Sequence, residues 1–564
     1  MEFPKVSWLK SPATVTGQDP LGTKYPSEDI YSKLLPGLTN VTDRLRYYSF
    51  YPWLIRAFEK HQGRLKKSPL YEVVRRADCL FSLIGLHHNH KTGSDNPVHG
   101  GLTGSRKLSV VMNDYLQTGE PIVISKYANR EDVLNRYFQN KFGGLGQYYL
   151  GPLKDALILG NNEKGEICYT DQKGKILAEA FDSGVDGEMF FEVLERDKVT
   201  AGDLESLGDF CPCRTASNEA EQEVLADFLF NRSETFSDEN TANRRQSLVL
   251  ILDFIEQLEY GGDSPILLNA EGIGSYLECC YAAALPNGSV WEITDQNLLR
   301  VQTHWRHYYA NELLSFAIQS LFWAGLKKLE SVDTYLPDSK AYGKWFANSF
   351  APHLEFNSSE SVGQLLSRLT AELPAPENLR DKEHEIQIVR RLFQLTSRGD
   401  SAEQTLNSAV NLSVKLLLTV ASRSIIDDWS NRFTLKLPAA FQKSYPINIH
   451  SFSTLIETIW QTKTIKEWIS VLAADWNIEV HLQAALRKLR YETSEKLRLV
   501  DTFKILPTER GLEIVEIPAP GFTNPRLKQS LQILADLGAL EFGAEGHLRL
   551  AAYGERLLEA NRNG

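Results

Sequence analysis

The chain is poor in cysteine, with six Cys among 564 residues. So few cysteines cannot form the disulfide scaffold of a small secreted domain. Long apolar runs are also lacking, so no membrane-spanning helix is predicted. The start, MEFPKVSWLKSP, has no basic stretch followed by an apolar run, as a signal peptide would. These absences predict a cytoplasmic protein with no membrane partner.

Familiar catalytic motifs are missing as well. The sequence contains no HExxH and no GxSxG. Gly160–Gly165 has the spacing of a phosphate-binding P-loop, but Glu166 stands where the lysine is required, so this segment is predicted to be a hairpin tip. Asp338-Ser339-Lys340 matches the acid-x-Lys element of Mg²⁺-dependent nucleases, but follows Leu-Pro in an expected loop. We therefore predict no catalytic residues and no cofactor. A cryptic nuclease or other hydrolase stays open, because active sites are defined by geometry.

Positive charge is scarce overall but unevenly distributed. The net charge is −11, yet residues 1–130 contain 18 Lys and Arg against 11 Asp and Glu. A basic N-terminal part on an acidic body predicts that any contact with phosphate groups is local.

An aromatic-rich helix is expected after Thr42 or Asp43, either of which can cap it. Arg44 and Arg46 would lie in its first turns, beside the run YYSFYPW. Interleaved arginines and aromatic rings can stack on bases. Aromatic residues at this density are more often core, with arginines reaching out of it.

The segments LGTKYPSEDIYSKLLPGLTNVTDRLRYYSFYPWLIRAF, RRADCLFSLIGL and HGGLTGSRKLS carry a resemblance. Over about 110 residues the N-terminal region resembles an uncharacterised bacterial family, a domain of unknown function. It departs at Pro36-Gly37-Leu38-Thr39, where the family usually has Thr in the third place. The resemblance implies a bacterial origin and the neighbourhood of restriction and anti-phage genes. It supplies no catalytic residues.

Residue types that bind metals occur as a group of histidines and as two pairs of cysteines. His87, His88, His90 and His99, with Asp95, are predicted to lie on a loop after an amphipathic helix at 70–86. A metal site needs fixed geometry, which such a loop does not supply, so a solvated turn is the simpler interpretation. Cys211-Pro-Cys213 is shorter than a CxxC knuckle and has no second pair at a suitable spacing. Cys279-Cys280 lies in an apolar helix, where free cysteines act as small hydrophobic residues. No metal site is predicted.

A repeated unit is indicated near both ends of the chain. Leu153–Leu159 matches Leu534–Leu540 in length, and Gly165 and Gly546 each follow six residues later. Alternating apolar residues and a closing helix come next in both copies. The order helix, turn, hairpin, helix is that of a winged-helix module. Two unrelated helix–hairpin–helix segments are the alternative.

The expected fold is mainly α, a multi-domain helical protein with two winged-helix-like modules that carry small β-hairpins. We predict a basic, aromatic-rich helical domain at 1–130 and a winged-helix-like module at 131–184. A central helical domain at 185–460 and a C-terminal helical plus winged-helix region at 461–564 follow.

The predicted function is that of a non-catalytic adaptor of a bacterial, anti-phage defence complex. Its partners would be other protein subunits, such as an ATPase, helicase or nuclease, and double-stranded DNA. Phosphate contacts are assigned to basic residues near the modules and in the N-terminal run: Arg487, Lys488, Arg490, Lys496, Arg526, Lys528, Arg44 and Arg46. The alternative is a kleisin-like scaffold that binds an ATPase without touching DNA, which the nearly neutral modules favour.

Overall fold

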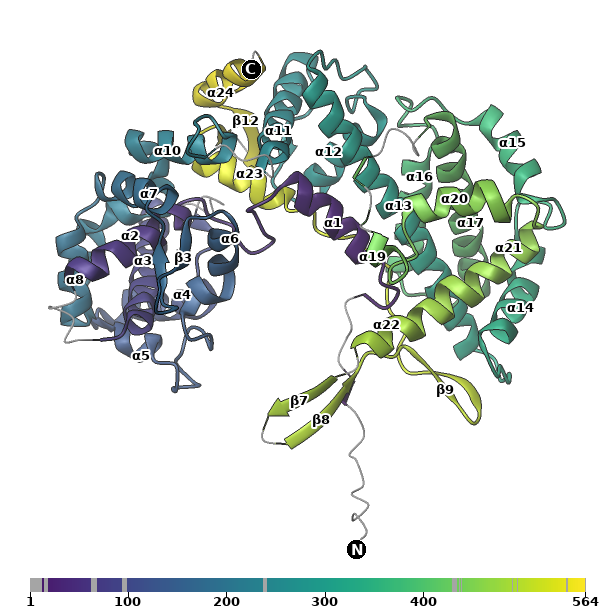
Figure 1. The fold of residues 1–564 in the computed structure, drawn as a ribbon, viewed down its shortest axis with the longest axis horizontal. Helices are drawn as coiled ribbons and strands as arrows, with labels where there is room; N and C mark the ends of the chain where they lie inside the picture. Colours follow the sequence, from purple (N-terminus) through teal and green to yellow (C-terminus); the bar gives the residue numbers. More distant parts are fainter. Residues whose placement is uncertain are drawn as a thin grey trace, which may run out of the picture. The chain divides into compact units, whose positions relative to one another are not determined.

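A computed structural model describes most of the chain. It covers residues 13–14, 19–61, 68–93, 99–236, 241–428, 434–435, 437, 439–488, 490–494, 496–543 and 546–562; in 490–501 and at 13–14 and 439–440 only the backbone is described. The fold is mainly helical, with 64% helix and 6% strand, which confirms the predicted class (Figure 1).

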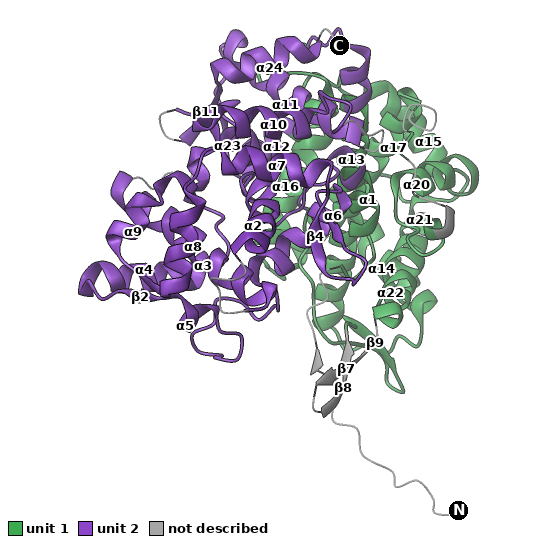
Figure 2. Cartoon of the chain, turned by 60° about the vertical axis from the view of Figure 1, so that its left-hand side comes forward, with its two compact units in different colours: residues 1–31, 277–291, 302–523 green, residues 32–276, 292–301, 524–564 purple. Residues whose placement is uncertain are grey.

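The described chain forms two compact units that interleave along the sequence (Figure 2). Unit 1 comprises 1–31, 277–291 and 302–523, and unit 2 comprises 32–276, 292–301 and 524–564. This division differs from four consecutive segments, because helices α1 (Lys24–Leu34), α12 (Ala270–Ala282) and α13 (Gln296–Glu330) each cross from one unit to the other.

Unit 1 is built from helices, with two small sheets of order β1-β8-β7 and β10-β9. Besides parts of α1, α12 and α13 it contains β1 (Ala13–Thr14), α14 (Ser339–Phe350), η6 (Ala351–His353), α15 (Val362–Glu372), α16 (Glu385–Ser397), α17 (Glu403–Ile426), α19 (Ala439–Gln442), α20 (Ile449–Leu455), η7 (Ile456–Trp460), α21 (Ile465–Val471), η8 (Leu472–Glu479), α22 (Val480–Lys488), β7 (Arg490–Ser494), β8 (Lys496–Asp501), β9 (Ile505–Thr508) and β10 (Gly511–Ile514).

Two features of unit 1 bear on the sequence predictions. The Asp338 side chain accepts a hydrogen bond from the Ala341 N–H at 2.8 Å, so the acid-x-Lys element contains the N-cap residue of α14.

Helix α17 is long and apolar enough to cross a membrane, but 78% of its most apolar 18-residue segment is buried inside the protein. Such burial is what a core helix shows.

Short strand pairs β2–β5 and β3–β4 lie among the helices of unit 2. Besides parts of α1, α12 and α13, unit 2 contains all the remaining elements. They are α2 (Tyr47–His61), α3 (Leu70–Thr92), α4 (Ser105–Thr118), β2 (Ile122–Val123), α5 (Ile124–Ala128), η2 (Leu145–Tyr149), α6 (Leu150–Asp155), β3 (Leu159–Asn161), β4 (Ile167–Tyr169), α7 (Lys173–Asp182), α8 (Gly187–Arg196), β5 (Lys198–Val199), α9 (Ala201–Ser206), η3 (Gly208–Phe210), η4 (Pro212–Ser217), α10 (Glu219–Phe230), α11 (Ala242–Gly261), β6 (Ile266–Leu267), α23 (Leu527–Asp536), β11 (Leu540–Phe542), β12 (His547–Leu550) and α24 (Ala552–Arg562).

Helix α2 is the centre of unit 2, and its aromatic residues are core. Tyr47, Phe50 and Trp53 are fully buried. The Phe50 ring lies 4.1 Å from that of Phe81 in α3, and the Trp53 ring lies 5.1 Å from that of Phe181 in α7. Rings at these separations contribute beyond their buried area. The core interpretation of the aromatic run is confirmed. The helix starts at Tyr47, however, so Arg44 and Arg46 precede it.

The two helix–hairpin–helix segments repeat the same backbone. The Ile158 N–H donates to the Leu153 carbonyl at 2.8 Å, and the Ala539 N–H donates to the Leu534 carbonyl at 2.9 Å. Leu157 and Gly538, at equivalent positions, both have a positive φ, of 56° and 78°.

The closing helices match too. A Cβ added at Gly174 would lie 2.3 Å from the Ile158 carbonyl oxygen, and one at Gly554 would lie 2.1 Å from that of Ala539. Glycine is therefore required where each closing helix crosses the start of its hairpin. These equivalences support a repeated unit; its assignment as a winged helix stays a prediction.

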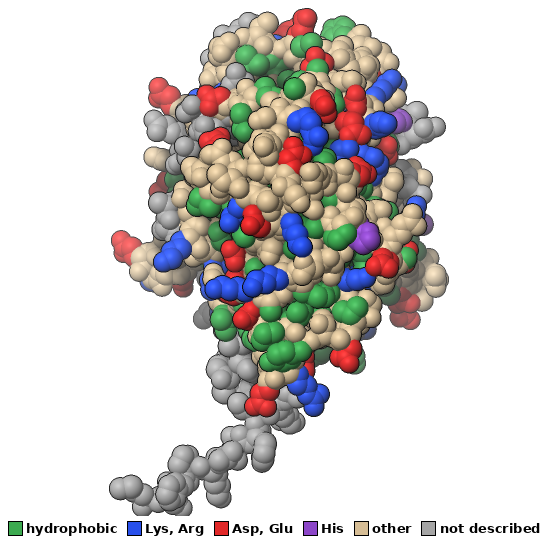
Figure 3. Space-filling model, turned by 90° about the vertical axis from the view of Figure 1, so that its right-hand side faces the viewer, with side chains coloured by type: hydrophobic (Ala, Val, Ile, Leu, Met, Phe, Trp, Pro, Cys, Tyr) green, Lys and Arg blue, Asp and Glu red, His purple; other side chains and the backbone are tan. Residues whose placement is uncertain are grey.

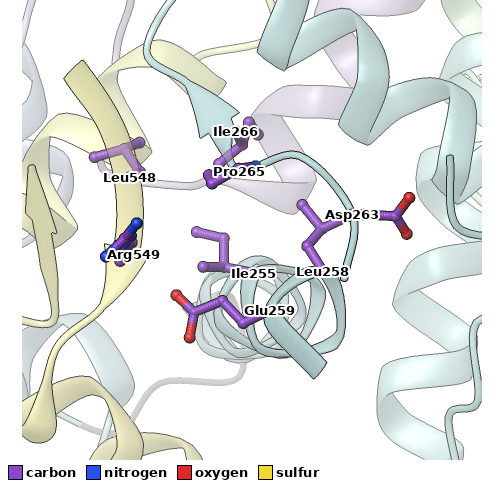
Figure 4. Close-up of a pocket in the computed structure, with 8 residues that line it drawn as sticks. All are labelled: Ile255, Leu258, Glu259, Asp263, Pro265, Ile266, Leu548 and Arg549. Carbon is purple, nitrogen blue, oxygen red and sulfur yellow. The ribbon is translucent and has the colours of Figure 1, made fainter. Parts of the chain in front are cut away.

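The C-terminal copy is packed into unit 2. Strand β12 pairs with both β11 and β6, so the hairpin is part of a three-stranded sheet. Leu548 and Arg549 of β12 line a 340 Å³ pocket together with Ile255, Glu259 and Ile266 (Figure 4). In α23, the helix before the hairpin, every residue except Lys528 and the half-buried Ala535 is buried. A helix enclosed in this way cannot lie in a DNA groove in this conformation.

Helix α3 continues through Thr92 and ends at Gly93, whose φ of 63° is left-handed. The prediction of a loop after residue 86 was therefore wrong, because residues 87–92 contain no glycine or proline that would end the helix before Gly93. His87, His88 and His90 lie on the last turns of this helix. His99 follows in the next described segment, while Asp95 lies outside the described residues.

A buried carboxyl group ties α3 to a glycine turn. Asp78 accepts hydrogen bonds from the hydroxyls of Tyr51 and Tyr137 at 2.7 and 3.0 Å and from the Gly144 N–H at 2.7 Å. Burial raises the pKa of Asp78 to about 6 from 3.8, and these hydrogen bonds act in the opposite direction.

The raised pKa predicts a pH-dependent stability. The contribution of Asp78 is fully present below its unfolded pKa near 4 and is lost as the pH rises through about 6. The unfolding free energy of the wild type minus that of Asp78→Asn should fall by up to about 3 kcal/mol between pH 4 and pH 7. Urea denaturation at several pH values measures it. Asp114→Asn, at an exposed position of α4, is the control; equal slopes for the two variants would contradict the prediction.

Candidate metal centre

Four metal-type side chains converge in unit 2. The potential ligand atoms of His88, His99, Cys211 and Cys213 all lie within 4.8 Å of one another. His88 Nδ1 lies 3.2 Å from the Sγ atom of each cysteine and 3.1 Å from His99 Nε2, and the two Sγ atoms are 3.2 Å apart.

Three segments position these groups. Helix α3 supplies His88 on its last turns, and His99 follows the helix in a short 3₁₀ turn. Cys211 and Cys213 flank Pro212, which begins η4. Because η4 continues from this Cys-Pro-Cys segment, the backbone conformation of 211–213 is fixed on both sides by η3 and η4. The site therefore has the second structural element that the histidines alone lack.

The distances fit a tetrahedral metal ion. Zinc binds thiolate sulfur at about 2.3 Å and imidazole nitrogen at about 2.1 Å, so a tetrahedron of two of each has edges of about 3.4–3.8 Å. The separations of 3.1 and 3.2 Å are slightly shorter than these edges, and all the ligand atoms lie within 4.8 Å of one another. A disulfide requires an S–S distance near 2.05 Å, so the pair is two free thiols.

The electrostatics also favour a thiolate. The hydrogen bond with Cys211 lowers the pKa of Cys213 to about 4, helped by His99 and His88 and opposed by burial. The same hydrogen bond, together with burial, raises the pKa of Cys211 well above its ordinary value. A cation among the four groups would favour deprotonation of both thiols.

Two buried arginines hold the backbone of the ligand segments. The Arg46 guanidinium donates to the Cys211 carbonyl at 2.7 Å and makes an ion pair with Glu221 at 2.9 Å. Arg44 donates to the carbonyl of Gly100, next to His99, at 3.1 Å and makes an ion pair with Asp536 at 2.8 Å. Partners of this kind orient metal ligands.

Their burial corrects the prediction that Arg44 and Arg46 bind nucleic acid. Both residues are 0% exposed. A phosphate group cannot reach them unless two buried ion pairs break, and removal of one partner from such a pair costs about 3–5 kcal/mol.

The other predicted contacts are scattered. Arg526 donates to the Leu35 carbonyl and the Ser32 hydroxyl, whereas Lys528 is exposed on α23. Arg487 is exposed at the end of α22, donates to the Ser444 carbonyl at 2.6 Å and lies over the Tyr445 ring. Lys488 donates to the Asp19 carbonyl. Arg490 and Lys496 lie on β7 and β8, and their side chains are outside the described part of the chain.

Charges on the visible face of the molecule are mixed. Figure 3 shows lysine and arginine side chains interspersed with acidic ones. DNA-binding surfaces usually carry clustered Lys and Arg. The arrangement on this face therefore does not favour a broad DNA-binding surface.

The sequence does not group these four residues because the two halves of the cluster are distant in the chain. His88 and Cys211 are 123 residues apart, so no short motif contains both a histidine and a cysteine of the set. A useful signal would have been the total of two unassigned cysteines and several clustered histidines, which together complete a four-ligand set.

Comparisons with protein-family models, with curated proteins and with solved structures found no match for this chain. The resemblance of the N-terminal region to a family of unknown function therefore stays a prediction, and the site is interpreted from its own geometry.

The Arg44–Asp536 ion pair makes a prediction about stability. Asp536→Ala leaves a buried guanidinium without its counter-ion and should lower the unfolding free energy by about 3–5 kcal/mol. Urea denaturation measures the loss. Glu541→Ala, at an exposed position of β11, is the matched control and should cost less than about 0.5 kcal/mol. Equal stability of the two variants would show that the pair contributes little.

The ligand set makes a prediction about metal content. Protein purified from zinc-supplemented cells should contain about one zinc ion per chain, and Cys213→Ser should lose most of it, because four-coordinate sites depend on each ligand. Elemental analysis measures the content. Cys168→Ser, which removes a free cysteine of β4 outside the cluster, should retain it. Metal-free wild-type protein from such cells would refute the site.

Proposed function

We propose that the protein is a non-catalytic adaptor whose unit 2 is held in shape by a structural zinc ion and which binds other protein subunits. The observation that carries this proposal is the four-ligand set of two histidines and two cysteines. The resemblance of the N-terminal region favours a bacterial defence complex as its setting, in the cytoplasm.

A complete ligand set supports a structural role. Structural zinc sites are closed by four protein ligands, whereas catalytic sites keep three and leave a position for water or substrate. With two histidines and two thiolates bound, a tetrahedral ion has no vacant position. The metal would then contribute folding free energy and no reaction step.

The metal would also connect the parts of unit 2 that an adaptor needs to keep rigid. Its ligands join the end of α3 to the segment that leads into η4. Near η4, the Gln222 side chain of α10 donates to the Leu537 carbonyl at 2.8 Å. Arg44 links the His99 side of the site to Asp536 in α23. Loss of the ion would therefore loosen the attachment of the C-terminal repeat.

Protein partners are favoured over DNA. Burial of Arg44, Arg46 and α23 argues against the predicted groove contact, and among the predicted residues whose side chains are described, Arg487 and Lys528 are exposed. These two cations would supply a small part of the six to ten phosphate contacts typical of salt-dependent DNA binders. A nuclease is less favoured too, since the acid-x-Lys element caps a helix.

The experiment is affinity purification of the tagged protein from its native host, with nuclease added to one half of each lysate. Wild type and Cys168→Ser should retain the same protein partners with and without nuclease. Cys213→Ser should retain them poorly, because unit 2 is loosened. Partners that disappear on nuclease treatment would indicate attachment through nucleic acid and would contradict the proposal.

A direct measurement of DNA binding separates the two alternatives. The affinity of the wild-type protein for a DNA duplex, measured at several salt concentrations, should be weak. The double variant Arg487→Glu/Lys528→Glu should change that affinity little. A steep dependence on salt that this double variant flattens would instead support the DNA-binding hypothesis.

A further inference from the structure

Four of the ten residues that line a pocket beside the N-terminal half of α3 are cations. Its volume is about 470 Å³, within the range of small-molecule sites. Its charged lining residues are Glu72, Arg75 and Arg76 of α3, Arg130 and Glu131 of the segment after α5, and Lys141. The four cations in this lining outnumber its two carboxylates, in a chain whose net charge is −11.

Arg75 is a buried cation that lacks a carboxylate partner in the described part of the chain. It is 2% exposed, and its guanidinium donates to the carbonyls of Ala128, Phe138 and Asn140. Asp78, one turn along α3, accepts its hydrogen bonds from Tyr51, Tyr137 and Gly144 instead. A buried charge is costly unless an opposite charge compensates it, so an anion in the pocket would be stabilised.

Arg76 offers an unused donor in the same wall. Its Nε atom is buried and has no hydrogen-bond acceptor among the described residues. Its Nη2 atom lies 3.4 Å from the Asp197 carboxylate, with the side chain 18% exposed. A buried donor without an acceptor carries a desolvation cost that a bound oxyanion would remove.

Lys141 and Arg130 are the exposed cations of the pocket lining. The Lys141 ammonium lies 4.9 Å from the centre of the Tyr71 ring, and within the described residues it has no carboxylate at ion-pair distance. Arg130 is about half exposed and lies 3.1 Å from Glu131, an exposed pair that solvent screens. Both cations can turn toward a ligand at little cost.

We propose that this pocket binds a phosphate group. Arg76 Nε and Lys141 Nζ would donate to the phosphate oxygens, Arg130 would add charge, and Arg75 would supply a fixed positive field behind them. Charge-assisted hydrogen bonds from guanidinium and ammonium groups suit phosphate. The proposal uses none of the metal ligands, so it stands independently of the structural zinc site. It also gives the basic N-terminal part a local site for phosphate.

The test is calorimetric titration of the full-length protein with inorganic phosphate, with ATP and with a short single-stranded oligonucleotide. Saturable 1:1 binding of at least one probe is expected. The double variant Arg130→Ala/Lys141→Ala removes exposed side chains and should weaken that binding by about tenfold or more. A control that removes the exposed Lys164 on the β3–β4 turn, Lys164→Ala, should leave it within about twofold.

The relative affinities of the three probes distinguish the source of the phosphate group. Tighter binding of ATP or inorganic phosphate than of the oligonucleotide assigns the site to a small ligand. Tighter binding of the oligonucleotide assigns it to a nucleic-acid backbone. Absence of binding by all three probes overturns the proposal, as does binding that the double variant and the Lys164→Ala control reduce equally.

Discussion

The buried ion pairs of Arg44 and Arg46 are the constraint on which unit 2 depends. Each guanidinium is removed from water, and each is compensated by a carboxylate from a distant element, Asp536 in α23 and Glu221 in α10. Both also donate to backbone carbonyls that adjoin or belong to candidate metal ligands, at Gly100 and Cys211. The aromatic core of α2, the candidate metal centre and the C-terminal repeat therefore share two side chains, and none can move without disturbing the others.

The combination explains why charged residues stand beside the aromatic core helix α2. A hydrophobic residue at position 44 would pack well but could not fix the direction of α23 or of the segment after α3. Charged groups cost desolvation energy and give directional bonds in return. In this molecule the directional bonds converge on the segments that carry His99 and Cys211, two of the candidate metal ligands, and so help to fix the positions of these groups.

Much of the fold was predictable from local pattern, but the site was not. The helical class follows from the spacing of apolar residues, and the repeat follows from matched leucines and glycines, whose equivalence at Leu157 and Gly538 the backbone bears out. Arg44 and Arg46 were misassigned because a sequence does not show which distant carboxylate a cation meets. His88 and Cys213 were missed for the same reason, since a ligand set made in three dimensions has no spacing rule in one. The compact units interleave, so no linear boundary could describe them.

The separation between Arg44 and Asp536 along the chain has a consequence for biosynthesis. The two partners are 492 residues apart in sequence. A ribosome adds about 5–20 residues per second, so Arg44 waits on the order of half a minute to a minute and a half before its counter-ion is made. During that interval the aromatic residues around α2 can collapse, but the charge beside them has no partner and must stay in water. The newly made chain therefore carries an unpaired charge beside its aromatic cluster until α23 has been synthesised, and unit 2 cannot complete its packing before then.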